Sequence, residues 1–129
     1  MDDLVEQARD ALASAYAPYS EYQVGAAIQA ADGSVFTGCN IENANYSNSL
    51  HAEEVALSAA VAAGHRSFAR IAVTSSEDDG VLPCGMCRQT LNEFCDPDFG
   101  VITVENGTTT EHRLGDLLPN AISPETLGR

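Results

Sequence analysis

Apolar residues recur along the first part of the chain with two different periods. From residue 3 to residue 16, leucine and alanine are spaced three and four positions apart, which predicts an amphipathic helix that ends before Pro18. Residues 22–30 and 34–40 are strand-like, and the turn residues 31–33 between them predict a hairpin. A polar, turn-rich loop is expected to follow the hairpin.

The next part of the chain alternates helical and strand-like segments. Residues 52–63 are rich in alanine and precede Gly64, which is suited to end a helix. Residues 70–75 contain several β-branched side chains and predict a strand. After an acidic loop, residues 83–94 predict a second helix with a proline in its first turn.

Two further strand-like segments lie near the end of the chain. Residues 101–104 and 108–112 flank the pair Asn106-Gly107, which favours a tight hairpin turn, and residues 114–118 predict a short helical turn. We find no internal repeat and no linker. The order of elements predicts the α/β class, as a single three-layer domain over residues 1–129 with a mixed central sheet flanked by helices.

Length and charge narrow the classes of function. A chain of 129 residues with 44% hydrophobic content can bury the core of one domain without disulfides. Six arginines, no lysine and nineteen acidic residues give a net charge of −13, which repels phosphates, so we expect no nucleic-acid partner. No apolar run approaches the roughly 20 residues of a membrane span, and we see no export signal. We therefore expect a cytoplasmic protein without a membrane partner.

The acidic composition also indicates the kind of organism from which the protein comes. The absence of lysine, together with acidic clusters such as Glu77-Asp78-Asp79, is typical of proteins from salt-loving organisms, in which concentrated salt screens the repulsion between carboxylates. A halophilic source is the interpretation we favour. An ordinary acidic protein is the alternative, and high salt would weaken the argument against nucleic acid.

Four cysteines raise the question of disulfides or metal binding. Thiols stay reduced in a chain without an export signal, so a closely spaced pair favours metal binding or catalysis. Cys39 and Cys95 stand alone, and we expect them to be small core residues. His65 and His112 have no ligand-like spacing, and we expect them on the surface.

The remaining cysteines form a pattern with one histidine. His51-Ala52-Glu53 lies at the start of one predicted helix, and Pro83-Cys84-x-x-Cys87 lies at the start of another. This combination resembles the signature of the zinc-dependent nucleobase deaminases. Three protein ligands leave the fourth tetrahedral position of zinc open for water, and positive helix N-termini help thiols to ionise.

The resemblance implies a role for each residue of the pattern. His51, Cys84 and Cys87 would bind Zn²⁺, which makes a water molecule acidic enough to attack the base at neutral pH. Glu53 would be the catalytic residue that moves a proton from that water to ring N3 and then assists the departure of ammonia.

The rest of the chain resembles the short, homotetrameric cytidine deaminases almost from end to end. The matching segments are residues 17–20, 24–27, 38–44, 83–89 and 117–119. The resemblance implies a hydrolase that converts cytidine, and deoxycytidine, to the uracil nucleoside plus ammonia in pyrimidine salvage. It also implies a homotetramer with one zinc ion per subunit.

In that family an Asn-x-Glu segment binds the ribose, and this role falls on Asn40 and Glu42. An amide and a carboxylate suit sugar hydroxyls, whereas a 5′-phosphate would call for a basic side chain, so a free nucleoside is favoured over a nucleotide. The alternative is that both residues only organise a polar loop. We also expect Ala52, between the histidine and the catalytic glutamate, at the substrate.

The chain departs from the family pattern at several positions. Tyr22 stands where phenylalanine is common, and we expect it to pack near the nucleoside. Near the C-terminus, Ile122 stands where family members carry a phenylalanine that reaches a neighbouring subunit's pocket, and we expect Ile122 at a subunit boundary. His51 and Glu54 stand where the family usually has cysteine and arginine.

These last two changes are related through charge. Zinc with two thiolates and a neutral imidazole carries one negative charge fewer than zinc with three thiolates. We therefore expect Glu54 to be free to join the acidic surface, and Arg88, beside Cys87, to remain available as a hydrogen-bond donor to the two sulfurs.

Two other functions fit the same signature. One is deamination of another nucleoside-like compound such as blasticidin S, and the other is a zinc-stabilised binding module without catalysis. The presence of Glu53 argues against the binding module, because such a module has no need of a proton shuttle.

Overall fold

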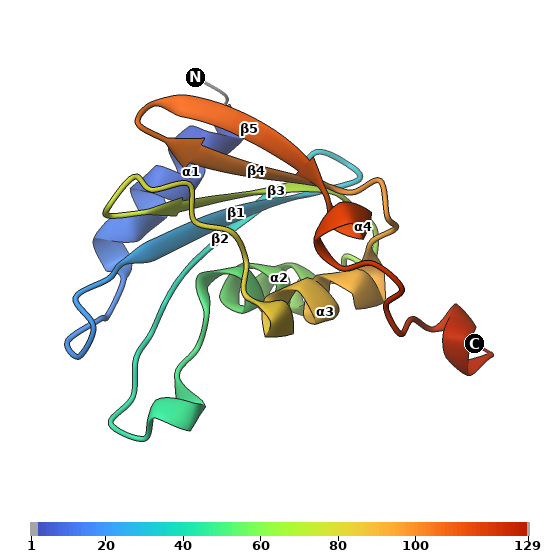
Figure 1. The fold of residues 1–129 in the computed structure, drawn as a ribbon, viewed down its shortest axis with the longest axis horizontal. Coiled ribbons are helices and arrows are strands. Elements are labelled where there is room, and N and C mark those ends of the chain that lie inside the picture. Colours follow the sequence, from blue (N-terminus) through green and yellow to red (C-terminus); the bar gives the residue numbers. More distant parts are fainter. Residues whose placement is uncertain (1–2, 129) are drawn as a thin grey trace.

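Five strands form one mixed sheet in the order β2-β1-β3-β4-β5 (Figure 1). The computed structural model describes residues 3–128. The strands are β1 (Val24–Ala30), β2 (Val35–Cys39), β3 (Phe68–Ser75), β4 (Gly100–Glu105) and β5 (Thr108–Arg113). Only β3 and β4 pair in parallel, and each other neighbouring pair is antiparallel.

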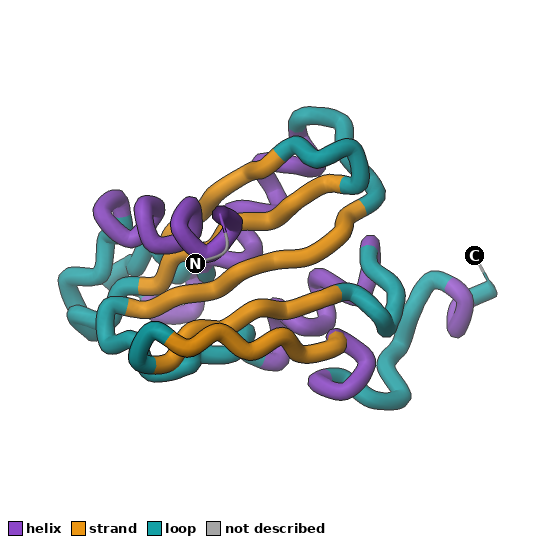
Figure 2. Tube along the Cα trace, turned by 90° about the horizontal axis from the view of Figure 1, so that it is seen from above, coloured by secondary structure: helices purple, strands orange, loops and turns teal. Residues whose placement is uncertain are grey.

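Helices cover both faces of this sheet (Figures 1 and 2). Helix α1 (Asp3–Ala11) packs its Leu4, Val5 and Ala8 on one face. Helices α2 (Ala52–Ala62) and α3 (Gly85–Phe94) lie on the other face, and the short α4 (Leu114–Leu117) follows β5. The expected three-layer α/β architecture with a mixed central sheet is therefore confirmed.

The first helix is shorter than its pattern predicts. It ends at Ala11, and a 3-10 turn over Leu12–Ser14 follows. The backbone N–H of Tyr16 donates to the carbonyl of Asn40 at 3.0 Å, and Tyr16 forms an isolated bridge with Ile41. This long-range pairing needs extended backbone, so it overrides the helical pattern of residues 12–16.

Helix α3 begins two residues later than predicted. Cys84 is its N-cap, with φ −68° and ψ 169°, so Pro83 lies just outside the helix and not in its first turn. The expected hairpin turns are confirmed, because Gly33, Asn106 and Gly107 all have positive φ.

Gly38 allows α2 to approach β2 closely. A Cβ atom at this position would lie 2.5 Å from the Ala52 carbonyl oxygen and from the Ala56 nitrogen. The first turn of α2 therefore rests directly on the strand, and this places the residues at the helix start beside the end of β2.

Of the residues assigned to core and surface, three are placed differently from our expectation. Cys95 is buried, as expected, but Cys39 is only partly buried. His65 and His112 are half-buried and not on the open surface. The ring of His65 packs against Phe36 at a centroid distance of 5.1 Å, and Nε2 of His112 lies 3.3 Å from the Thr103 hydroxyl. Within residues 3–128, no helix has the length and apolar character that crossing a membrane requires.

Candidate active site

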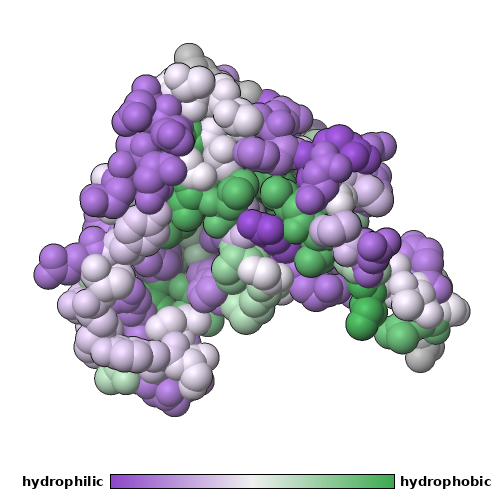
Figure 3. Space-filling view, in the orientation of Figure 1, coloured by the Kyte–Doolittle hydropathy of each residue, from purple (hydrophilic) through white to green (hydrophobic). Residues whose placement is uncertain are grey.

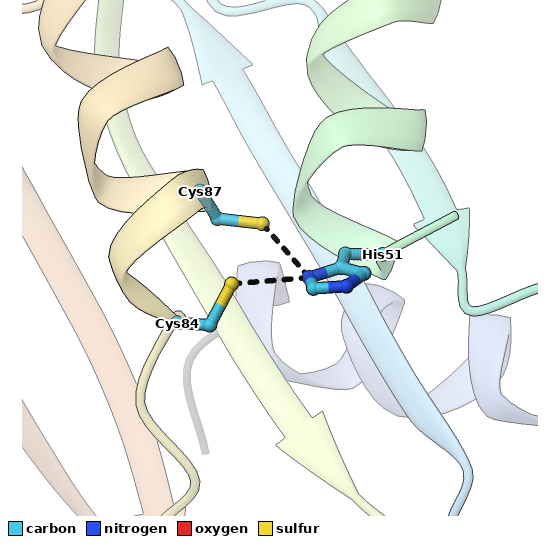
Figure 4. Close-up of side chains that lie close together, drawn as sticks. All are labelled: His51, Cys84 and Cys87. Atoms are coloured by element: carbon cyan, nitrogen blue, oxygen red, sulfur yellow. Dashed lines mark hydrogen bonds between the residues drawn. The ribbon is translucent and has the colours of Figure 1, made fainter. Parts of the chain in front are cut away.

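His51, Cys84 and Cys87 meet where the N-termini of α2 and α3 come together (Figure 4). His51 is the N-cap of α2, Cys84 is the N-cap of α3, and Cys87 lies in the first turn of α3. Nδ1 of His51 lies 3.1 Å from Sγ of Cys84 and 3.4 Å from Sγ of Cys87. Their ligand atoms all lie within 4.8 Å of one another.

This donor set fits one zinc ion. Tetrahedral zinc with its usual bond lengths to nitrogen and sulfur holds those atoms about 3.5 Å apart, close to the observed separations. Cys87 is buried, His51 is half-buried and Cys84 is exposed, so the site opens to solvent on one side. Among the described residues, no other cluster of histidine, cysteine and acidic groups has this compactness.

The electrostatics of the site favour a cation. Burial raises the pKa of the Cys87 thiol, and the neighbouring Glu53 carboxylate raises it further. The N-termini of α2 and α3 stabilise a negative charge and so offset part of the cost of ionising this thiol. A bound cation would offset much more of it, because the thiolate is then paired with the metal.

Glu53 is a buried carboxyl next to the three candidate ligands. Its exposed fraction is 5%, and burial is the main cause that raises its pKa above the ordinary range for glutamate. A carboxyl with a raised pKa holds a proton more readily than an ordinary glutamate does. Glu53 is thus suited to proton transfer inside the site.

A cavity of about 230 Å³ joins these groups to the residues expected at the sugar. Its wall is formed by the end of β2, the start of α2 and the loop before α3. The lining residues are Val24, Asn40, Glu42, Ser49, Leu50, His51, Ala52, Glu53, Val81, Leu82 and Cys84. A larger hollow of about 520 Å³ lies between the end of α3 and the C-terminal tail, but it contains none of the expected site residues.

Comparison with known proteins places this site in a family. The family model for the cytidine and deoxycytidylate deaminase zinc-binding region matches residues 1–103. The chain is 42% identical to a cytidine deaminase of Sporosarcina psychrophila, over 98% of this chain and 94% of the relative. The chain belongs to the cytidine and deoxycytidylate deaminase family. It is therefore an enzyme of the hydrolase class.

Solved structures support this assignment. The crystal structure of cytidine deaminase from Burkholderia pseudomallei superposes on this deaminase with a TM-score of 0.89 at 45% identity, covering 93% of this chain and 97% of that one. The cytidine deaminase of Mycobacterium tuberculosis superposes with a TM-score of 0.83 at 38% identity, covering 93% and 94%.

The deaminase holds the side chain of Asn40 in one orientation. Its Oδ1 accepts a hydrogen bond from the Val24 backbone at 2.9 Å, and its Nδ2 donates to the carbonyl of Tyr22 at 2.8 Å. One N–H and one lone pair of the amide are left for a ligand. Asn40 therefore both organises the polar loop and offers a donor and an acceptor.

Glu42 of the deaminase is held by the turn at residues 19–20. Its Oε1 accepts from the backbone N–H groups of Tyr19 and Ser20 at 2.9 and 3.1 Å, and its Oε2 accepts from the Ser20 hydroxyl. The Ser20 hydroxyl is the main cause that lowers the pKa of Glu42. An ionised carboxylate with one lone pair of Oε2 still free can accept from a ligand hydroxyl.

Of the other expected residues of the deaminase, Ala52 lies at the cavity as expected, and Tyr22 and Arg88 have other partners than expected. Ala52 is buried and lines the cavity, whereas Tyr22 points its hydroxyl at Asp79. The guanidinium of Arg88 donates to the carbonyls of Pro83 and Leu117, so its partners are backbone oxygens and not the sulfurs that we expected.

Ile122 lies in the C-terminal tail, away from the cavity of its own chain. The residue is 61% exposed. Its carbonyl oxygen accepts from Gln89 at 2.8 Å and from Asn92 at 3.0 Å, so the tail is attached to α3 at this point.

The placement of Glu54 differs from our expectation that it is free to join the acidic surface. The Glu54 carboxylate accepts a 2.7 Å hydrogen bond from the backbone N–H of His51. Glu54 is half-buried and caps α2, so it is not simply part of the acidic surface. A glutamate three residues after the N-cap of a helix is a capping signal, and the sequence contains it at this position.

Val81 and Leu82 are cavity residues that the sequence analysis missed. They follow an acidic loop and belong to no periodic segment. The only local signal is their position just before Pro83-Cys84, because residues next to a metal ligand are carried to the same place in the fold.

Proposed function

We propose that this enzyme catalyses hydrolysis of cytidine to uridine and ammonia, and of deoxycytidine to deoxyuridine and ammonia, as a step of pyrimidine salvage with one Zn²⁺ per subunit. The observation that carries the proposal is the joining of two groups in one cavity. His51, Cys84 and the buried Glu53 line this cavity together with Asn40 and Glu42, and Cys87 completes the compact His/Cys/Cys donor set.

The chain's own residues perform the proton transfers in this proposal. Zinc, when bound, supplies the chemistry that makes water a nucleophile at neutral pH. Glu53 accepts a proton from the attacking water, delivers it to ring N3, and then assists transfer to the leaving amino group. One water is consumed and one ammonia is released. Burial of Glu53 supports this role, because it keeps the carboxyl pKa closer to the working pH.

Asn40 and Glu42 determine the position of the sugar in this proposal. Asn40 can both donate to and accept from a hydroxyl, and Glu42 can accept from one. None of the described residues that line the cavity is an arginine, and the chain has no lysine. A 5′-phosphate would therefore meet carboxylates without a compensating cation, which favours a nucleoside over a nucleotide.

We further propose a cytoplasmic homotetramer adapted to high salt. Thiol ligands suit a reducing compartment. The C-terminal tail projects from the body and exposes apolar residues (Figures 1 and 3), with Ile122 61% and Leu127 69% exposed. Tyr46 in the loop before α2 is 74% exposed. Burial of these residues between subunits would explain their apolar character, with Ile122 at a subunit boundary.

Ammonia release measured on a substrate panel tests the proposed reaction. Cytidine and deoxycytidine should be turned over, whereas deoxycytidylate and adenosine should not, and the protein should contain one zinc per chain. Turnover of blasticidin S in place of cytidine would assign a different substrate. Stoichiometric zinc without ammonia release from any compound would leave a binding module.

A further inference from the structure

Tyr22 carries a hydroxyl group that the deamination chemistry does not use. This hydroxyl donates a 2.7 Å hydrogen bond to Oδ2 of Asp79, a residue of the loop before α3 that is 57 positions away in the sequence. Hydrogen bonds to a carboxylate are stronger than those between neutral groups. A phenylalanine in the same place could pack but could not make this link.

Asp79 uses its second oxygen for another contact. Its Oδ1 accepts a 2.7 Å hydrogen bond from the hydroxyl of Ser75, the last residue of β3. Ser75 is buried, with 7% of its surface exposed. The carboxylate therefore joins a fixed strand end to the Tyr22 side chain.

Both ends of the Tyr22–Asp79 contact lead to the cavity. The carbonyl of Tyr22 accepts the hydrogen bond that orients the Asn40 amide. On the other side, the chain continues from Asp79 to Val81 and Leu82, which form part of the cavity wall. A change in the contact can thus reach two different walls of one site.

The start of the loop is already attached to this side by Ser76, whose backbone N–H donates to the Gln23 carbonyl at 2.9 Å and whose hydroxyl accepts from the Gln23 N–H at 3.1 Å. The backbone at Asp78 and Gly80 bonds to Asn106 and Val104, which fixes the opposite side of the loop to the β4–β5 hairpin. Of the described residues 77–82, only Asp79 hydrogen-bonds the segment 20–24. Beyond Ser76, the Tyr22–Asp79 contact is therefore the hydrogen bond that holds this part of the loop to the segment 20–24.

We propose that the Tyr22–Asp79 pair is a latch that holds the loop 77–82 against the start of β1, and that both residues are positioning residues for nucleoside binding. The proposal rests on the proposed function for its substrate. It replaces our expectation that Tyr22 acts by packing against the nucleoside. The latch touches neither the candidate zinc ligands nor Glu53, so it acts on the affinity for substrate and not on the chemical step.

Tyr22→Phe tests the latch with the smallest possible change. We expect the KM for cytidine to rise about three- to tenfold, the effect of one lost hydrogen bond, while kcat stays within about twofold. Hydrogen–deuterium exchange should become faster at the amides of residues 80–82 and stay unchanged in α2. This second measurement does not depend on turnover or on bound metal.

Variants of Asp79 test whether the two residues act as a pair. Asp79→Ala should raise KM at least as much as Tyr22→Phe, and the double variant should be no worse than Asp79→Ala alone. Asp79→Asn keeps an oxygen that accepts from Tyr22 and should restore most of the affinity. Tyr16→Phe and Asp10→Ala, on exposed residues outside the site, are the matched controls and should leave KM unchanged.

The results separate the latch from the proposed function. If wild-type protein deaminates cytidine but Tyr22→Phe changes neither KM nor the exchange of residues 80–82, the latch does not exist. Effects of the two single variants that multiply in the double variant would also overturn it, as would a lower melting temperature with an unchanged KM. If the wild-type protein does not act on cytidine, the proposed function is wrong. The hydrogen–deuterium exchange of residues 80–82 in Tyr22→Phe then tests the latch by itself.

Discussion

Reversing the charge at Glu54 should destabilise the start of α2. In this structure Glu54 accepts a 2.7 Å hydrogen bond from the His51 N–H, so Glu54→Arg removes the acceptor and places a positive charge in the first turn of a helix. Loss of such a cap costs about 1 kcal/mol. The unfavourable helix dipole adds about 0.5 to 1 kcal/mol. We expect the free energy of unfolding to fall by about 1.5 to 2 kcal/mol.

Urea unfolding of the metal-free protein measures this change, and two controls divide it into its parts. Glu54→Gln keeps an oxygen that can accept from His51, so it should lose only a few tenths of a kcal/mol. Glu6→Arg reverses a charge in the first turn of α1, where no capping bond is seen for Glu6, and should show the dipole part alone.

The two control variants also show which outcome would contradict a capping role for Glu54. If Glu54→Arg were as stable as the wild-type protein, or no less stable than Glu6→Arg, the capping bond would contribute nothing. Glu54 would then belong to the acidic surface after all. A competing-chelator titration of the same variants should show weaker zinc binding for Glu54→Arg than for Glu54→Gln, because the cap orients the backbone of His51.

Other perturbations test separate parts of the molecule. Glu53→Ala should abolish turnover with zinc still bound, and loss of metal in that variant, measured by elemental analysis, would contradict the assignment. Cys87→Ala should lose zinc and lower the melting temperature by several degrees, as chelation of the wild-type protein should, because metal binding contributes directly to folding. The hydrogen bonds from Ser20 lower the pKa of Glu42 in the folded state. These bonds therefore stabilise the folded protein fully above the ordinary glutamate pKa of 4.5, and the contribution is lost as the pH falls through the lower folded-state pKa. Unfolding measured at about pH 6 and about pH 3 should therefore show a smaller acid-induced loss for Ser20→Ala than for the wild-type protein. Molar salt should strengthen both assembly and activity, because it screens chains that each carry −13, and equal oligomer size by light scattering in dilute buffer would contradict this.

Local patterns in the sequence predict the helices and strands and the residues that carry the chemistry. Periodicity predicts the strands and helices to within a few residues, because side chains three or four apart share a helix face and alternate residues share a sheet face. The spacings His51-x-Glu53 and Cys84-x-x-Cys87 are equally local, since each lies within one helical turn. The α/β class followed from the order of these elements.

The contacts between these elements follow from the tertiary fold and not from any local pattern. Packing of α2 over Gly38 brings His51 to the N-terminus of α3, and the pairing of Tyr16 with Ile41 shortens the first helix. The partners of Arg88 and the contact between Tyr22 and Asp79 also join distant segments. Such contacts depend on strand register and on packing between elements, and a periodic pattern encodes the faces of an element but not the partner that each face meets.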